Sequence, residues 1–213
     1  MLLSIVSTVK KKINDFFSPF IKTISYKGFT IYYSKGTSII DELLTQKNNT
    51  YEQEISEILI SELLKKPHPV FIDIGANIGL ITLNIISKIS SVKVFAFEPG
   101  PHQNALFKKT IAANNLNDRI HLSDIALSYY AGYSDFVTHY TEHASGDGFI
   151  DTGRAGIGTV IKVKTTTLDN WWEENKYPSI DVIKIDVEGS EFWILNGSEK
   201  LIEKLKPFII MEF

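Results

Sequence analysis

Short apolar segments alternate with helix-forming segments from Val70 onward, and this alternation most constrains how the chain can fold. Helices and strands that alternate at these lengths favour a mostly parallel sheet with helices on both faces, hence an α/β fold. In such sheets, ligands bind beyond the carboxyl ends of the strands. The pattern predicts strands at 70–74, 92–97, 119–125, 181–186 and 208–212, and helices at 79–89, 102–114, 168–175 and 190–205.

Residues 1–20 have apolar side chains at the helical period, which predicts an amphipathic helix. The apolar run before Lys10 is far shorter than the roughly 20 residues that a membrane span needs. The basic cluster at 10–12 follows this run, whereas in a signal peptide it would precede it. Two interpretations stay open: the helix packs on the main domain or on a second copy in a homodimer, or it lies on a membrane as a peripheral contact.

The remaining N-terminal residues predict a small hairpin at 25–33, where β-branched and aromatic residues flank a Lys-Gly pair. Thr50 and Gln53 have the form of a capping box and predict the start of the next helix. We therefore divide the chain into an N-terminal segment, 1–49, and a main domain, 50–213.

Charge and cysteine content exclude several classes of protein. The 22 Lys and Arg residues face 25 Asp and Glu residues, and only Arg119 and Arg154 are arginines, so no basic surface is expected for nucleic acid. The chain has no cysteine, which removes disulfides, thiolate nucleophiles and cysteine zinc sites. This composition is compatible with a cytoplasmic location.

A glycine-containing turn follows the first predicted strand. Asp73 is succeeded by Gly75, Asn77 and Gly79, and the next helix begins there. Glycines let a backbone approach a ligand closely, and a helix start offers free N–H groups. A dinucleotide fingerprint would need glycine at Asn77 and at Leu80, so it fails twice. We therefore expect this turn to bind a ligand other than a pyrophosphate.

Glu98 ends the second predicted strand, where an acidic side chain can accept hydrogen bonds from both ribose hydroxyls of a nucleoside. Carboxylates at Asp73 and Glu98 repel phosphate, and they favour a nucleoside that carries a cationic amino-acid end. That description fits S-adenosylmethionine. A nicotinamide oxidoreductase is the less favoured alternative, because the glycine fingerprint is missing.

Five ordered segments, from FIDIGANIGLITL to the closing PFIIMEF, resemble the FkbM-type methyltransferases, a branch of the class I S-adenosylmethionine-dependent enzymes. The other three are FAFEPGPHQNALFKKTIAANN, DIALSYYAG and the pair TTTLDNWW with IDVIKIDVEGSEFWIL. The resemblance runs from about Thr50 to the last residue and implies a Rossmann-like sheet ordered 3-2-1-4-5. It also implies three contacts with the cofactor. Glu98 would bind its ribose. Its methionine end would lie at Asp73, Gly75, Asn77 and Gly79, and its adenine at Asp124, Ile125 and Ala126.

The fourth predicted strand ends in Lys184, Asp186 and Glu188, and the two carboxylates are expected at the ligand end of the sheet. A carboxylate there can accept the proton of a substrate hydroxyl, orient that hydroxyl or stabilise a sulfonium charge. We expect Asp186 and Glu188 to be catalytic. Glu191 is placed equally well to complement the start of the following helix.

His139 and His143 lie in a loop between two predicted strands, 134–140 and 159–165. With Glu142 they resemble a metal-ligand set, but the glycines of this segment argue against a helix that would hold both rings together, and we expect no metal. The loop is a candidate substrate lid, in which either histidine serves as general base, or else a solvated loop.

Together these features predict a methyltransferase that acts on an oxygen of a carbohydrate or secondary metabolite. The alternative outside catalysis is a cofactor-binding or degenerate partner subunit. The fifth predicted strand ends the chain, so the sixth and seventh strands usual in this class are expected to be absent, either because the sheet is naturally short or because the product is truncated. A short sheet would leave the fifth strand as an edge.

Overall fold

The computed structural model describes residues 21–34, 40, 43, 50–139, 147–149 and 158–212. The predicted amphipathic helix at 1–20, with its proposed membrane and dimer contacts, lies outside the described residues. His143 lies outside them as well. Within the described part of the chain, no helix has the length and hydrophobicity required to cross a membrane.

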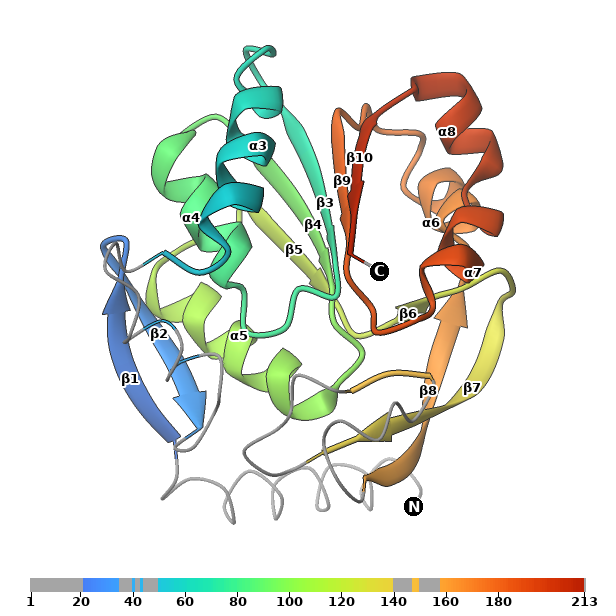
Figure 1. The fold of residues 1–213 in the computed structure, drawn as a ribbon, viewed down its shortest axis with the longest axis horizontal. Coiled ribbons are helices and arrows are strands. Elements are labelled where there is room, and N and C mark those ends of the chain that lie inside the picture. Colours follow the sequence, from blue (N-terminus) through green and yellow to red (C-terminus); the bar gives the residue numbers. More distant parts are fainter. Residues whose placement is uncertain are drawn as a thin grey trace.

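A five-stranded sheet forms the centre of the molecule, and all of its strands run parallel (Figure 1). Its order is β5-β4-β3-β9-β10, which in chain order is 3-2-1-4-5, so the predicted order is confirmed. The strands are β3 (Val70–Ile74), β4 (Lys93–Phe97), β5 (Ile120–Ser123), β9 (Val182–Ile185) and β10 (Phe208–Met211).

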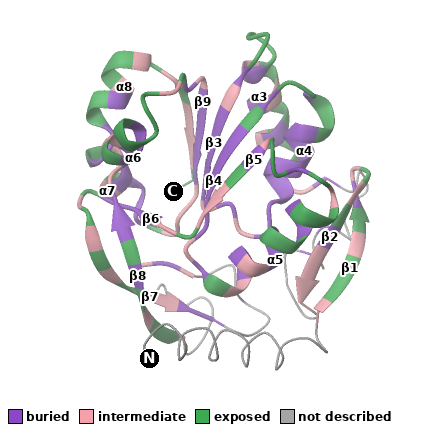
Figure 2. Ribbon diagram, turned by 180° about the vertical axis from the view of Figure 1, so that it is seen from behind, coloured by how far each residue is buried: buried purple, intermediate pink, exposed green. Residues whose placement is uncertain are grey.

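Two hydrophobic clusters cover the two faces of this sheet, because side chains alternate along each strand. Phe71 of β3 points into one cluster, and Ile72 points into the other. Figure 2 shows the buried residues concentrated in the strands and on the inner sides of the helices. The first cluster is covered by α3 (Gln53–Leu63), α4 (Leu80–Lys88) and α5 (Pro101–Ala113), and the second by α6 (Leu168–Glu174), α7 (Glu191–Asn196) and α8 (Glu199–Leu205).

The predicted single helix at 190–205 is wrong, because α7 and α8 are separated at Gly197 and Ser198. A Cβ at Gly197 would lie 2.2 Å from the carbonyl oxygen of Ser128, so the chain passes too close for a larger residue. The Asp169 carboxylate of α6 then accepts the backbone N–H groups of Lys200 and Leu201 and caps a second helix start.

A smaller sheet lies against the ligand end of the main one (Figure 1). It contains β6 (Ala126–Leu127), β7 (Gly132–Thr138) and β8 (Thr159–Thr166). β7 and β8 pair antiparallel, which confirms the predicted pair of strands in this region, and β6 joins β8 in parallel.

The predicted hairpin is confirmed as β1 (Ile21–Tyr26) and β2 (Phe29–Ser34), and its turn uses positive φ values at Lys27 and Gly28. The hairpin packs on α5, where the N–H of Tyr32 donates to Thr110 Oγ1 at 3.0 Å. Asn114 exchanges two hydrogen bonds with the backbone of Thr30. Tyr26 and Ile31 are fully buried in the same cluster as Phe71, so the hairpin shares the core of the main domain.

The capping box predicted at Thr50 is absent. Glu52 is the N-cap residue of α3, with a left-handed φ of 44° and no side-chain capping bond. Thr50 instead accepts a hydrogen bond from Lys27 Nζ, because the hairpin turn reaches this segment. The Glu52 side chain therefore makes no capping bond to α3; it has a hydrogen bond with Tyr51, and its Oε2 atom has no partner.

Candidate active site

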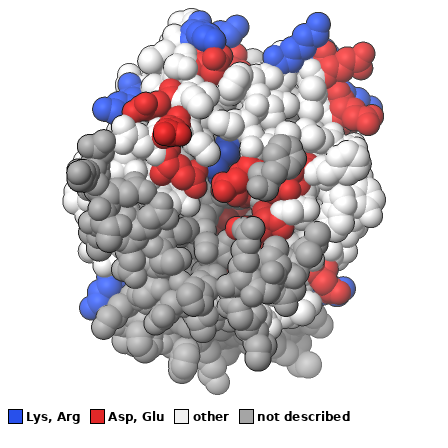
Figure 3. Space-filling view, in the orientation of Figure 1, with Lys and Arg blue, Asp and Glu red and all other residues white. Residues whose placement is uncertain are grey.

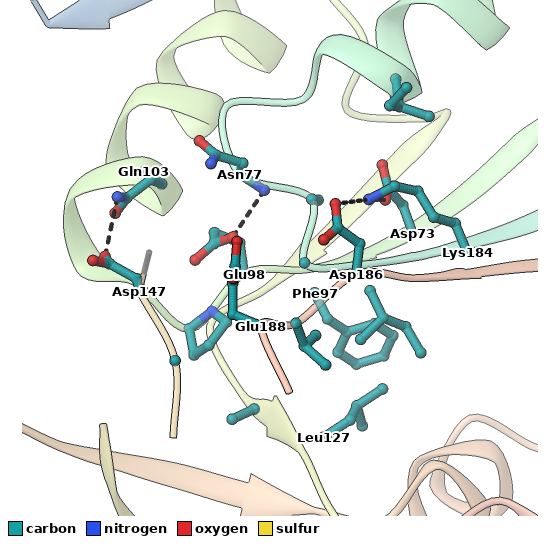
Figure 4. A pocket seen from close by; sticks show the side chains of 18 of the residues that line it. Asp73, Asn77, Phe97, Glu98, Gln103, Leu127, Asp147, Lys184, Asp186 and Glu188 are labelled. Carbon is teal, nitrogen blue, oxygen red and sulfur yellow. Dashed lines mark hydrogen bonds and ion pairs between the residues drawn. The ribbon is translucent and has the colours of Figure 1, made fainter. Parts of the chain in front are cut away.

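A pocket lies at the carboxyl ends of the sheet strands, as expected for this architecture. The loops after β3, β4, β5 and β9 line it, and residues 147–149 close one side (Figure 4). Asp186 and Glu188 also line it, whereas His139, Gly79 and Asp124 do not. The predicted cofactor residues found in the lining are Asp73, Gly75, Asn77, Glu98, Ile125 and Ala126.

The glycines of the first turn are required by packing inside the protein. Gly75 has a φ of +78°, and a Cβ there would lie 1.8 Å from the carbonyl oxygen of Asp186. Gly79 has a φ of +88°, and a Cβ there would lie 2.1 Å from the Phe107 ring of α5. The turn after β3 can therefore contact both the end of β9 and helix α5 only if these positions lack side chains.

Glu98 is buried, and backbone N–H groups hold both of its carboxylate oxygens. The N–H of Asn77 donates to Oε2 at 2.8 Å, and the N–H of Gly100 donates to Oε1 at 2.7 Å. Burial raises the pKa of Glu98 to about 7, although these two hydrogen bonds act in the opposite direction. Glu98 thus faces the pocket in a fixed orientation (Figure 4), and its protonation state changes with pH near neutrality.

Lys184 is a buried cation, only 4% exposed, at the other end of the pocket. Its Nζ lies 2.9 Å from Asp186 Oδ2 and 3.7 Å from Asp73 Oδ1. Burial alone would lower the pKa of Lys184, but the neighbouring carboxylates of Asp73 and Asp186 reverse that effect and raise it. Lys184 therefore stays charged and fixes the Asp186 side chain at the pocket wall.

Asp73 is fully buried, and its Oδ2 accepts a hydrogen bond from Thr82 at 2.6 Å. Burial raises its pKa, while Lys184 and Thr82 lower it. Its Oδ1 has no hydrogen-bond donor. Asp73 is thus engaged mainly by protein groups, and Lys184 lies between it and Asp186 (Figure 4).

Three carboxylates form a group beside Lys184. One oxygen each of Glu52, Asp186 and Glu212 lies within 4.8 Å of the others. Figure 3 shows acidic side chains gathered near the centre of this face, around a small patch of basic atoms. In its charge and its oxygen donors, this group suits a cation.

Glu188 stands in the turn after β9 with a left-handed φ of 53°. The buried Glu191 carboxylate lies behind this turn and accepts the N–H groups of Val187 and Gly189 on the two sides of Glu188. Glu191 therefore supports the turn from inside the protein, and Glu188 belongs to the pocket lining.

His139 is 2% exposed and lies behind the pocket wall. Its Nδ1 is 3.1 Å from Asp147 Oδ1, and Asp147 also accepts hydrogen bonds from Thr138 and Gln103. Asp147, which does line the pocket, is thereby tied to both β7 and α5. His139 thus supports Asp147 from behind and does not itself line the pocket.

Asp124 points to solvent, with a side chain 66% exposed and an oxygen 4.0 Å from Lys108 Nζ. The neighbouring Ile125 and Ala126 face the pocket with Leu127, Phe136 and Phe149 and form its apolar wall.

Comparison with known protein families shows which family the chain belongs to. Residues 73–213 match the methyltransferase FkbM domain. The chain is a member of the FkbM methyltransferase family. The predicted family is thereby confirmed, together with its activity as an S-adenosylmethionine-dependent methyltransferase.

Two methyltransferases are similar to this chain. The 2-O-methyltransferase NoeI of Sinorhizobium fredii is 30% identical over 169 residues, which cover 72% of this chain and 67% of NoeI. The hexuronic acid methyltransferase AglP of Haloferax volcanii is 26% identical over 195 residues, covering 92% of this chain and 74% of AglP. Among solved structures, a SAM-dependent methyltransferase from Agrobacterium tumefaciens is 11% identical with a TM-score of 0.48, over 90% of this chain and 52% of that one.

The residues of this FkbM pocket fit S-adenosylmethionine, whose sulfonium and ammonium groups are both cationic. Seven carboxylates line the described part of the pocket against one lysine. The Oε2 atom of Glu52 is buried without a hydrogen-bond partner, as Asp73 Oδ1 is, so acceptors are available for a bound cation. The apolar wall formed by Ile125, Ala126, Leu127, Phe136 and Phe149 suits an adenine ring.

Four residues of the FkbM site were not predicted as ligand-facing groups. Glu52 and Glu212 join the pocket from the start of α3 and the end of β10, and Asp147 joins it from the loop after β7. Lys184 was expected beside Asp186 but not as the partner of Asp73. No local motif marks these positions, because each depends on contacts between distant segments.

Proposed function

We propose that this protein transfers the methyl group of S-adenosylmethionine to a hydroxyl oxygen of a small molecule, in particular a carbohydrate. The observation that carries this proposal is the FkbM pocket with carboxylates at the end of β9. The names of NoeI and AglP, a 2-O-methyltransferase and a hexuronic acid methyltransferase, support an oxygen of a sugar as the acceptor. A secondary-metabolite hydroxyl is the alternative acceptor.

In this proposal, Glu98 accepts the ribose hydroxyls of the cofactor, and its fixed carboxylate is already oriented for them by Asn77 and Gly100. The turn at Gly75 and Asn77 lies beside the methionine end, and the wall containing Ile125 and Ala126 lies beside the adenine. Gly79 acts indirectly, by letting α5 pack under the turn. The Asp124 side chain is exposed and outside the pocket lining, and its contact with the adenine stays a prediction.

When bound, the cofactor supplies a methyl carbon whose bond to sulfur breaks as the acceptor oxygen attacks, and the sulfur keeps the electron pair. Asp186 or Glu188 accepts the proton that the acceptor hydroxyl loses. Lys184 holds the Asp186 carboxylate in one position, so orientation of the hydroxyl contributes along with base strength. His139 is bonded to Asp147 and does not line the pocket, so we do not propose it as that base.

Cofactor binding tests the first half of the proposal. Calorimetry should show that S-adenosylhomocysteine binds the wild-type protein and that Glu98→Ala weakens binding by about 1.5–3 kcal/mol, the scale of hydrogen bonds to a charged group. NAD should not bind. Unchanged affinity in Glu98→Ala would remove Glu98 from the ribose site.

Methyl transfer tests the second half. Labelled S-adenosylmethionine should transfer its methyl group to a member of a panel of neutral sugars, sugar acids and hydroxylated metabolites, and Glu188→Gln should reduce this transfer while retaining cofactor binding. If cofactor binds but no acceptor is methylated, the protein is instead the non-catalytic partner subunit. A cytoplasmic location, peripheral membrane contact through residues 1–20 and a homodimer stay predictions.

A further inference from the structure

Glu52 lies in the pocket although it precedes residue 73, where the family match begins. It is the N-cap residue of α3, and its side chain makes no capping bond to that helix. Its Oε2 atom is buried and has no hydrogen-bond partner. The side chain is therefore directed away from its own helix and toward the pocket carboxylates of Asp186 and Glu212.

The charges at this end of the pocket are unbalanced. Glu52, Asp73, Asp186 and Glu212 carry four carboxylates, and Lys184 is the cation that the described residues place among them. Burial raises the pKa of Glu52. Lys184 and a hydrogen bond with Tyr51 lower it, and the carboxylates of Asp186 and Glu212 raise it further. Such a group gains stability from a second cation, and its oxygens lie close enough together to bind one.

The two ends of the pocket differ in the ligand parts that they suit. Glu98 and Asp147 lie toward one end, and Lys184 with Asp186 lies toward the other, on the far side of the turn at Asn77 (Figure 4). A nucleoside whose ribose is bound at Glu98 and whose adenine rests on the apolar wall directs its amino-acid part toward Asp186.

We propose that Glu52, Asp186 and Glu212 together bind the α-ammonium group of the cofactor. This assignment rests on the proposed function, because it takes S-adenosylmethionine as the ligand. An ammonium group has three N–H donors, and the cluster offers one acceptor from each of three carboxylates. Lys184 occupies the other side of Asp186 and keeps that carboxylate in place. The segment before the family match thus completes the cofactor site.

A comparison of two ligands tests this assignment. S-adenosylhomocysteine carries the ammonium group, whereas 5′-methylthioadenosine has the same adenosine and sulfur without the amino-acid part. Calorimetry on wild type, Glu52→Gln and Glu212→Gln should show that each substitution weakens S-adenosylhomocysteine about tenfold or more, the effect of losing a charge-assisted hydrogen bond. Affinity for 5′-methylthioadenosine should change less than about twofold, since that ligand does not reach the cluster.

The matched control is Glu203→Gln, which removes an exposed carboxylate from α8 and should leave both affinities unchanged. Thermal unfolding without ligand checks the fold, and neither Glu52→Gln nor Glu212→Gln should lower the melting temperature, because each relieves repulsion within the cluster. Equal losses for both ligands, or no loss for S-adenosylhomocysteine, would overturn the assignment.

A divalent metal is the competing occupant. The titrations are therefore repeated after EDTA treatment and again with Mg²⁺ or Mn²⁺. Weaker binding of S-adenosylhomocysteine to Glu52→Gln that persists in EDTA supports the ammonium site. Two results together would assign the cluster to a metal. Glu52→Gln would weaken S-adenosylhomocysteine only when metal is present, and the same substitution would abolish metal binding. If the wild-type protein binds neither nucleoside, the proposed function itself is wrong. If wild type and both variants bind S-adenosylhomocysteine with the same affinity, only the ammonium assignment is wrong.

Discussion

Gly75 and Asp186 touch through their backbones, since a Cβ on Gly75 would lie 1.8 Å from the Asp186 carbonyl oxygen. Their strands are neighbours in the sheet, and the N–H of Asp186 donates to Ile74. The turn after β3 and the loop that carries the proposed catalytic carboxylates are therefore one packed unit.

Gly75→Ala should destabilise the protein by roughly 3 kcal/mol, because a methyl group forced against backbone adds an overpacking cost to the cost of a left-handed residue. Gly28→Ala is the matched control: its φ is +88°, and nothing lies within 4 Å of a Cβ there. It should show only the left-handed cost, about 1–2 kcal/mol. Urea unfolding of both variants measures the difference, and equal losses would contradict the close contact.

S-adenosylhomocysteine should bind less tightly as the pH falls below about 7, the raised pKa of Glu98. Ribose hydroxyls donate to the ionised carboxylate, so protonation competes with binding and costs up to about tenfold in affinity per pH unit. Calorimetry between pH 5.5 and 8 in buffers of different ionisation enthalpy would detect the released proton. Glu98→Gln should remove the dependence, and a wild-type profile as flat as that of the variant would contradict the assignment.

The ligand-free protein should respond to pH in the opposite direction. The pKa of Glu98 is raised from 4.5 to about 7, so the folded protein binds its proton more tightly than the unfolded chain does. The stabilisation from this group is fully present below about pH 4.5 and is lost as the pH rises through about 7. Subtracting the unfolding free energies of Glu98→Gln from those of wild type at several pH values isolates the effect; a difference that rises over this range would have the wrong sign.

Lys184→Met should destabilise the protein by about 3–5 kcal/mol, because it leaves the buried carboxylate of Asp73 and the partly exposed carboxylate of Asp186 without their cation. Lys200→Met, on the exposed side of α8, should change stability by less than about 0.5 kcal/mol. Adding Asp73→Asn to Lys184→Met should recover part of the lost stability, because it removes one of the two unpaired carboxylates. Acidic pH should do the same by protonating them. Chemical denaturation measures each case, and a loss no larger than that of Lys200→Met would show that the buried pair is unimportant.

Asp169→Ala should cost about 1 kcal/mol, since it removes the cap that Asp169 supplies to α8. Glu203→Ala, within the same helix but without a capping role, should be nearly neutral. Amide hydrogen exchange should also show faster exchange at Lys200 and Leu201 in Asp169→Ala, and unchanged protection there would argue against the cap.

The sheet could be predicted from the sequence because its strands are buried on both faces and appear as continuous apolar runs. Their order followed from the family resemblance. The break between α7 and α8 could not be predicted, because it depends on Asp169 and on the close approach of Ser128 to Gly197. The capping box at Thr50 failed for a similar reason, since Lys27 reaches that hydroxyl.

The candidate site was predicted where one local motif carries it, as at Glu98 and the turn after β3. The glycines of that turn were interpreted as room for a ligand, and the structure shows that they make room for Asp186 and Phe107. Those partners are distant in sequence, so no local pattern indicates them. The same holds for Glu52 and Glu212, which meet only when α3 and β10 are brought to one edge.

The hairpin β1–β2 has a practical consequence for anyone who trims this protein. Tyr26 and Ile31 fill the core alongside Phe71, and α5 bonds the hairpin backbone through Thr110. A recombinant fragment that starts at residue 73 would bare this apolar surface to water and would lack Glu52 as well. The smallest unit worth expressing therefore begins no later than Ile21, well ahead of residue 73, where the family match begins.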